Sequence, residues 1–98
     1  MAHITVDHKK ISDFCRRHHI RKLALFGSVL RKDFKPESDV DVLVEFEEGL
    51  VPGLAFFSME RELSEIFNRK VDLNTLQFLS PYFRDQVLGE AEAQYVAA

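Results

Sequence analysis

Two aspartates two residues apart, followed by a third further along the chain, have the residue types and spacing best suited to chemistry. Asp39 and Asp41 open an apolar stretch that alternates like a β-strand, so their carboxylates point to one face with Cα atoms about 6.5 Å apart. Like charges so placed repel each other, and a pair of divalent cations about 3.5–4 Å apart would relieve that repulsion. Oxygen donors of this kind suit Mg²⁺ or Mn²⁺. The alternative is a solvated strand end, and the apolar residues that follow Asp41 favour the metal site.

The third aspartate, Asp72, lies in a second short apolar stretch, Val71–Leu73. Placed beside the first pair, its carboxylate could bind one metal ion and accept the proton of an attacking hydroxyl. The alternative is an exposed acid at a strand end, paired with Lys70 or Arg69.

A glycine and a serine, Gly27 and Ser28, stand where a short apolar run ends. Glycine permits close backbone approach and positive φ, and the free N–H groups at the start of the next element can bind a phosphate. The Ser28 hydroxyl would add a further bond to a phosphate oxygen. Arg31, about one turn later, could clamp a phosphate or orient an aspartate through a forked contact. Taken alone, Gly27 could be a turn residue, Ser28 a helix cap and Arg31 a surface cation.

Apolar periodicity predicts the elements that must position these side chains. Helices are expected over Asp7–His19, Gly53–Phe67 and from Ser80 towards Tyr95, with a short helix or turn over residues 28–33. Strands are expected over Leu23–Phe26, Val40–Phe46 and Val71–Leu73. The order α-β-α-β-α-β-α predicts an α/β (α+β) fold, in which helices cover a small mixed sheet of three strands.

The composition limits the class of protein. A chain of 98 residues fits a single domain over residues 1–98. A net charge of −3 argues against a protein that coats nucleic acid, and nucleic acid is not the expected direct substrate. No apolar run is long enough to span a bilayer, and a lone cysteine, Cys15, fits a reducing compartment, so we expect a cytoplasmic protein without membrane contact.

The combined pattern resembles a known family. Gly27-Ser28, Arg31 and Ser38-Asp39-x-Asp41 before an apolar strand resemble the signature of the DNA polymerase beta nucleotidyltransferase superfamily. Within it the whole chain resembles the minimal nucleotidyltransferase (MNT) domains. The resemblance implies a nucleotidyltransferase fold, ATP as substrate and two Mg²⁺ ions, with these roles: nucleotide binding by Gly27, Ser28, Arg31 and Ser38; metal binding and catalysis by Asp39, Asp41 and, by its position, Asp72. Lys32 stands where the MNT group often has glycine.

The resemblance also implies a partner. Similar MNT proteins are commonly paired with a HEPN-domain ribonuclease toxin, which they inactivate by moving AMP from ATP onto one of its tyrosines. The chain is therefore expected to be an antitoxin with protein adenylyltransferase activity, and an oligomer is compatible with its small core. The apolar segment Leu50–Phe57 is compatible with a partner surface, although we expect most of its residues to begin a buried helix.

Two other functions compete with this hypothesis. The chain could be a binding module that neutralises a partner protein by complex formation without catalysis. It could also be another two-metal enzyme, such as a phosphohydrolase, although a Gly-Ser phosphate site before the aspartates argues against that. A template-directed polymerase is not expected, because the chain has no room for domains that grip a duplex.

Overall fold

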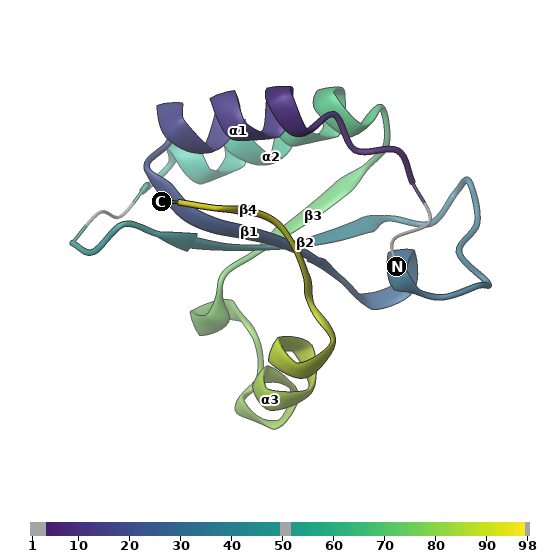
Figure 1. Cartoon of the computed structure of the whole chain (residues 1–98). Helices are drawn as coiled ribbons and strands as arrows, with labels where there is room; N and C mark the ends of the chain where they lie inside the picture. Colours follow the sequence, from purple (N-terminus) through teal and green to yellow (C-terminus); the bar gives the residue numbers. More distant parts are fainter. Residues whose placement is uncertain (1–3, 50–51, 98) are drawn as a thin grey trace.

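A four-stranded sheet carries two helices on one face and a third helix on the other (Figure 1). The computed structural model describes residues 4–49 and 52–97. Its helices are α1 (His8–Arg17), α2 (Ala55–Phe67) and α3 (Pro81–Glu90), with 3₁₀ turns η1 (Gly27–Leu30) and η2 (Leu76–Phe78). Its strands are β1 (Ile20–Phe26), β2 (Val40–Phe46), β3 (Val71–Asn74) and β4 (Glu92–Val96). The strand order is β3-β2-β1-β4; β2 and β3 run parallel, while β1 is antiparallel to both β2 and β4.

The main core lies between the sheet and the two helices α1 and α2. The predicted apolar face of the first helix is confirmed, since Ile11, Phe14 and Cys15 are fully buried. Burial raises the pKa of the Cys15 thiol to about 12, so this thiol is inert at neutral pH. The predicted cap is confirmed too: the Asp7 carboxylate accepts a hydrogen bond of 3.1 Å from the Lys10 amide.

The two faces of β2 separate as the alternation predicts. Val40, Val42 and Val44 enter the core under α1 and α2. Leu43 faces the other way and packs with Phe26 of β1. β2 thus carries the apolar core on one side and Asp41 on the other. All three predicted strands are present, as β1, β2 and β3.

The prediction of a last helix running towards Tyr95 is wrong beyond Glu90. Ala91 takes an extended conformation, and residues Glu92–Val96 form β4 instead. Tyr95 pairs with Leu23 of β1 and packs against the main core. The free edge of β1 explains the switch, because its unpaired backbone groups gain partners when the chain returns as a strand. The sheet thus has four strands rather than three, within the α/β class that the sequence predicts.

The segment Leu50–Phe57 does begin a helix, but most of it is not buried. Leu50 and Val51 lie outside the described residues. Of the remainder only Phe56 is buried, whereas the side chains of Leu54 and Phe57 are 85% and 66% exposed. The expectation of burial is therefore wrong for these two residues. Separately, within residues 4–49 and 52–97, the helices are all too short or too polar to cross a membrane.

One polar contact joins α1 to α2 above the core. Glu62 of α2 is bonded by the guanidinium of Arg17 and, at 3.0 Å, by Nε2 of His18. The His18 ring in turn lies 4.6 Å from the ring of Phe14. The bond from Arg17 and, to a smaller extent, the bond from His18 lower the pKa of the Glu62 carboxyl below its ordinary value of 4.5. The ionised form of Glu62 is therefore the one that the folded state favours.

Replacing Glu62 with glutamine should change how the free energy of unfolding depends on pH. A lowered folded-state pKa gives a stabilising contribution that is present above pH 4.5 and is lost as the pH falls through the folded-state value. Because the contact is partly exposed, we expect a loss of less than about 1 kcal/mol at pH 7. Urea denaturation at pH 7 and pH 3 measures it. The difference between wild type and Glu62→Gln should shrink at pH 3, and an equal difference at both values would contradict this role.

Candidate active site

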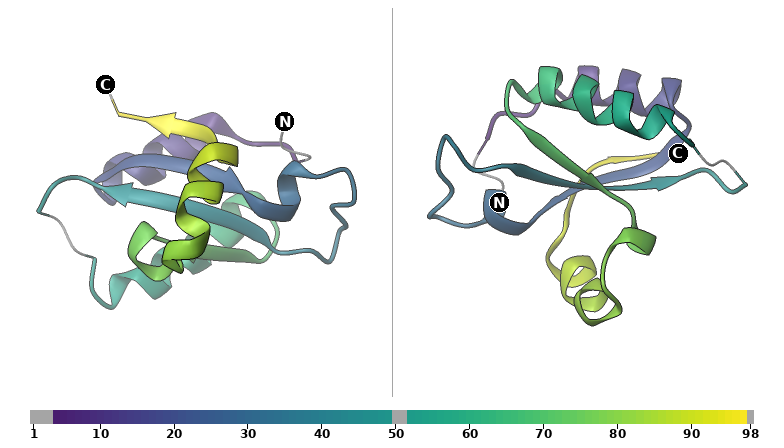
Figure 2. Two further views of the ribbon diagram at one scale, coloured as in Figure 1. Left: turned by 90° about the horizontal axis from the view of Figure 1, so that it is seen from below. Right: turned by 180° about the vertical axis from the view of Figure 1, so that it is seen from behind.

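Two carboxylates meet on neighbouring strands of the sheet. The parallel register of β2 and β3 pairs Asp41 directly with Asp72, so both side chains lie on the same face. Asp39 precedes the first residue of β2 and, two positions before Asp41, belongs to the same side of the strand. Asp41 and Asp72 therefore lie side by side on the face of the sheet that α1 and α2 leave uncovered, which is the face that α3 crosses in Figure 2.

The surroundings of Asp41 disfavour the ionised form of its carboxyl group. Partial burial and the carboxylates of Asp72 and Asp39, in that order, raise the pKa of Asp41 from 3.8 to about 6, while Arg31 opposes the shift. Asp39 itself has a cation nearby, with its Oδ2 atom 3.8 Å from Nζ of Lys70. The acids therefore form a site in which added positive charge would be favourable.

Gly27 is packed directly against this site. Phe26, the last residue of β1, is the register partner of Asp41, so the chain turns at Gly27 beside the Asp41 carboxylate. Gly27 has φ of +75°, and a Cβ atom built there would overlap Oδ2 of Asp41 and lie 3.3 Å from its Cγ. Both the backbone angle and the contact require glycine here. The turn predicted to bind phosphate and the predicted metal ligands are therefore one site.

The cleft beside Gly27 gathers most of the predicted nucleotide-binding residues. Its volume is about 370 Å³, and Gly27, Ser28, Arg31 and Asp41 line it together. Ser28 lies in η1, which confirms the expected short helix or turn, although η1 ends at Leu30 and the expectation covered residues 28–33. Ser38 is not part of this lining: its Oγ accepts a 3.2 Å bond from the Lys35 amide and so closes the turn before Asp39.

A second contact holds the same loop. The guanidinium of Arg69 lies 4.4 Å from the centre of the Phe34 ring, and its Nη2 donates a 3.5 Å bond to the carbonyl of Lys35. The loop that leads into Asp39 is thereby tied to the residue before Lys70. Sequence reasoning offered Arg69 only as a partner for Asp72; the structure places it against Phe34 instead.

Sequence reasoning missed the other wall of the cleft. The helix α3 supplies Phe83, Gln86, Val87 and Glu90 to the lining. These positions are spaced i, i+3, i+4 and i+7, which is one face of a helix. Oε1 of Glu90 accepts a 3.3 Å bond from the amide of Gly27, so a carboxylate sits on an N–H group predicted to bind phosphate. The periodicity marks the face, but nothing in the sequence says that this helix crosses the face of Asp41.

The donor set fits a hard divalent cation. Asp39, Asp41 and Asp72 offer carboxylate oxygens, and a cation would counter both causes of the raised pKa of Asp41, its burial and the neighbouring carboxylates. In the part of the chain that the structure describes, no group of three or more His, Cys, Asp or Glu side chains is already close enough to hold a metal ion. Asp41 and Asp72 are adjacent, whereas the contact of Asp39 is with Lys70. The roles of these residues as metal ligands thus stay predictions.

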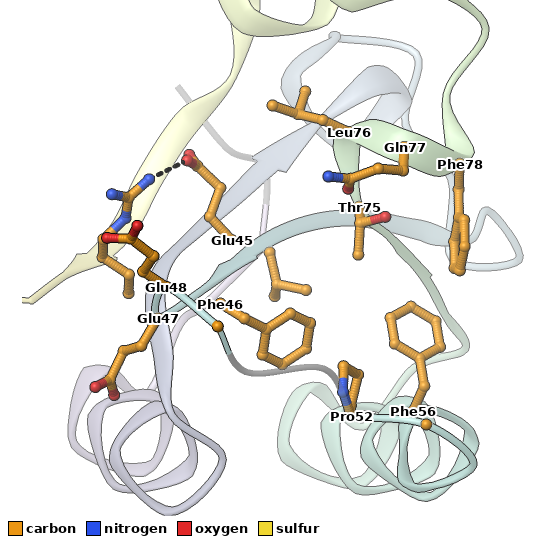
Figure 3. A pocket seen from close by; sticks show the side chains of 14 residues that line it. Glu45, Phe46, Glu47, Glu48, Pro52, Phe56, Thr75, Leu76, Gln77 and Phe78 are labelled. Carbon is orange, nitrogen blue, oxygen red and sulfur yellow. Dashed lines mark hydrogen bonds and ion pairs between the residues drawn. The ribbon is translucent and has the colours of Figure 1, made fainter.

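A larger pocket lies at the other end of β2 (Figure 3). Its volume is about 620 Å³. Figure 3 shows the rings of Phe46, Phe56 and Phe78 on one side and the side chains of Glu45, Glu47 and Glu48 on the other. Oε1 of Glu45 accepts a 2.8 Å bond from the Arg21 guanidinium. The pocket lining contains neither the Gly-Ser turn nor the aspartates, so the smaller cleft is the candidate active site.

Comparison with known proteins shows the family to which the chain belongs. The family model of the nucleotidyltransferase domain matches residues 8–93. A protein of Methanocaldococcus jannaschii, provisionally named a protein adenylyltransferase, is 35% identical over 83 residues, covering 85% of this chain and 88% of the relative. The protein adenylyltransferase MntA of Thermococcus cleftensis is 39% identical over 71 residues, covering 71% of this chain and 68% of the relative.

Solved structures share the fold. A structure described as a minimal nucleotidyltransferase superposes with a TM-score of 0.71 at 34% identity, covering 86% of this chain and 85% of the other. A toxin–antitoxin complex with AMP-PNP gives 0.74 at 22% identity, covering 94% and 75%. A complex of a tri-AMPylated HEPN toxin with its MNT antitoxin from Shewanella oneidensis gives 0.65 at 22% identity, covering 92% and 70%. With its family match, its fold and its Gly-Ser turn against paired aspartates, this chain belongs to the nucleotidyltransferase domain family and is a nucleotidyltransferase of the minimal type.

Proposed function

We propose that the chain transfers AMP from ATP onto a hydroxyl group of a partner protein and acts as an antitoxin. The observation that carries the proposal is the contact of Gly27 with Asp41, which joins the turn proposed to bind phosphate to the paired carboxylates of Asp41 and Asp72. The names of the relatives as protein adenylyltransferases support the choice of a protein acceptor.

The proposed reaction is one displacement at phosphorus. The acceptor oxygen attacks the α-phosphorus of ATP, the bond to the bridging oxygen of the β-phosphate breaks, and pyrophosphate leaves. Ser28 and the neighbouring backbone N–H groups hold the phosphates, and the Arg31 guanidinium neutralises charge on the leaving group. Asp72, exposed at the edge of the sheet, accepts the proton of the attacking hydroxyl.

Asp39, Asp41 and Asp72 are the residues that would hold two Mg²⁺ ions, with Mn²⁺ as a substitute. Bound there, the ions would neutralise the triphosphate and make the acceptor hydroxyl easier to ionise. The proposal needs no other cofactor.

The proposed acceptor is a tyrosine of a HEPN-type ribonuclease toxin. The AMPylated HEPN toxin that is seen in complex with an MNT antitoxin of similar fold supports this choice. The exposed apolar side chains of this chain, which include Leu54, Phe57 and Phe78, are compatible with a bound protein partner. The alternative is an antitoxin that neutralises its partner by binding alone.

Replacing Asp41 with asparagine should remove transfer while the fold is kept. Losing a direct metal ligand should cost at least about 100-fold in rate, since outer-shell partners already cost 10–100-fold. The measurement uses ATP labelled at the α-phosphate with Mg²⁺ and a lysate of the native cell, in which wild type should label a protein band. Asp13→Asn, an exposed aspartate on α1 beyond the opposite face of the sheet, is the matched control and should keep full activity.

A second variant separates catalysis from binding. If Asp39→Asn/Asp41→Asn still neutralises the co-produced partner, the binding-module alternative gains and the proposed reaction is not the antitoxin mechanism. Release of orthophosphate instead of pyrophosphate would indicate a phosphohydrolase.

Magnesium should stabilise the wild type against heat and should stabilise Asp41→Asn much less. Without metal, the raised pKa of Asp41 means that its stabilising contribution exists below pH 3.8 and is lost as the pH rises through about 6. Asp41→Asn should therefore be more stable than wild type at pH 7.5 in EDTA, by about 1 kcal/mol after allowance for partial exposure. That difference is roughly 4–8 °C in Tm. Equal shifts of Tm on adding Mg²⁺ to both proteins would argue against Asp41 as a metal ligand.

Replacing Glu90 with glutamine should tighten nucleotide binding. In wild type the Glu90 carboxylate occupies the Gly27 amide and would repel an incoming triphosphate. Glutamine keeps an acceptor oxygen without the charge, so we expect the Kd of ATP with Mg²⁺ to fall several-fold, measured by isothermal titration calorimetry. Asp85→Asn on the same helix is outside the cleft lining and controls for a general change of charge. Weaker binding by Glu90→Gln would mean that Glu90 assists the nucleotide instead.

A further inference from the structure

We propose that the ring of Phe83 is the surface on which the base of the bound nucleoside triphosphate stacks. This inference rests on the proposed function, and it concerns a residue on α3 that the nucleotidyltransferase signature in residues 27–41 does not contain. It assigns the second wall of the cleft to the nucleoside, as the Gly27 turn is assigned to the phosphates.

Phe83 is an aromatic side chain that belongs to neither of the two buried clusters. The helix α3 is held on the sheet through Val87, which is buried with Phe26 and Leu43. Phe83 lies one turn before Val87 and lines the same cleft, yet 58% of it is exposed. A ring left open in a cleft that also contains Asp41 is placed for a ligand rather than for the core.

The start of α3 is fixed in place, so the backbone that carries Phe83 is held beside the cleft. The Nε atom of Arg84 donates bonds of 2.8 Å to the carbonyl of Leu76 and 3.2 Å to that of Leu79. The Ser80 hydroxyl caps the helix by accepting from the amide of Tyr82. These contacts position Phe83 in advance, which lowers the entropic cost of a stacking contact.

The distance along the helix suits a nucleotide. The other end of the same helical face is Glu90, whose carboxylate lies 3.3 Å from the Gly27 amide. Phe83 precedes Glu90 by seven residues, or about 10 Å of helix rise. A nucleotide with its phosphates at Gly27 therefore has its base within reach of Phe83 when it lies along α3.

The chemistry predicts affinity without strong base selection. Every base has a π-face, so stacking on Phe83 would contribute to binding of any nucleoside triphosphate. Inorganic tripolyphosphate has no base, so its affinity should not depend on the Phe83 ring. This difference separates a stacking role from a role in keeping the cleft in shape.

The test compares two probes on the purified full chain with Mg²⁺: AMP-PNP and inorganic tripolyphosphate, both by calorimetry. Phe83→Ala should weaken AMP-PNP by roughly 5- to 100-fold, the range typical for loss of a stacking aromatic, and change tripolyphosphate less than about 2-fold. Phe83→Trp should restore AMP-PNP binding. Tyr82→Ala is the matched control: Tyr82 is adjacent, 92% exposed and outside the cleft lining, so neither probe should change.

Each other result overturns the inference. If Phe83→Ala binds AMP-PNP as tightly as wild type, the base does not stack on Phe83. Equal weakening of both probes makes Phe83 a structural residue of the cleft, and failure of Phe83→Trp to restore binding argues against stacking. If wild type binds neither probe, the proposed function fails as well. If wild type binds both and Phe83→Ala matches it, only the stacking inference fails.

Discussion

The repulsion between the carboxylates of Asp41 and Asp72 is the constraint on which the rest of the structure depends. Partial burial of Asp41 adds to this repulsion, and burial, Asp72 and Asp39 together, in that order, raise the pKa of Asp41 to about 6. The strands stay in register because their opposite faces are buried: Val40 and Val42 of β2, and Val71 and Leu73 of β3, all belong to the main core. A slip by one residue would turn that whole apolar set towards water. The core therefore holds together a site that would otherwise push itself apart.

One face of the sheet packs the core, and the other face carries the candidate site. The face under α1 and α2 is filled by fully buried side chains, among them Phe14, Leu23 and Leu63. The opposite face is covered only in part, by the small cluster of Phe26, Leu43 and Val87. A small domain has little stability to spare, and here nearly all its apolar burial lies on one side. The other side is then free to carry charges, a strained glycine and an open cleft.

Much of this arrangement follows from the sequence, for reasons that particular residues make clear. Alternation over Val40–Phe46 was enough to place Asp39 and Asp41 on one side of a strand, because side-chain direction in a strand has a fixed period. The position of Gly27 at the start of a short helix or turn follows from where the apolar run stops. The pairing of Asp41 with Asp72 could not be derived, since strand order and register depend on packing between segments about 30 residues apart. For the same reason the sequence predicts helix where β4 forms: Glu92–Val96 becomes a strand because the edge of β1 is free to pair.

The balance of charge in the cleft explains why metal and nucleotide would have to arrive together. The carboxylates that line the cleft are those of Asp41 and Glu90, and Asp72 and Asp39 lie near enough to raise the pKa of Asp41, while the cation in the lining is Arg31. On the proposed function, a triphosphate entering alone would meet this negative field at close range, in a partly buried setting that water screens poorly. Divalent cations held by the aspartates would supply positive charge that attracts the triphosphate and neutralises these carboxylates. The carboxylates that would repel a triphosphate without metal would therefore make the cleft select a metal–nucleotide complex over either component alone.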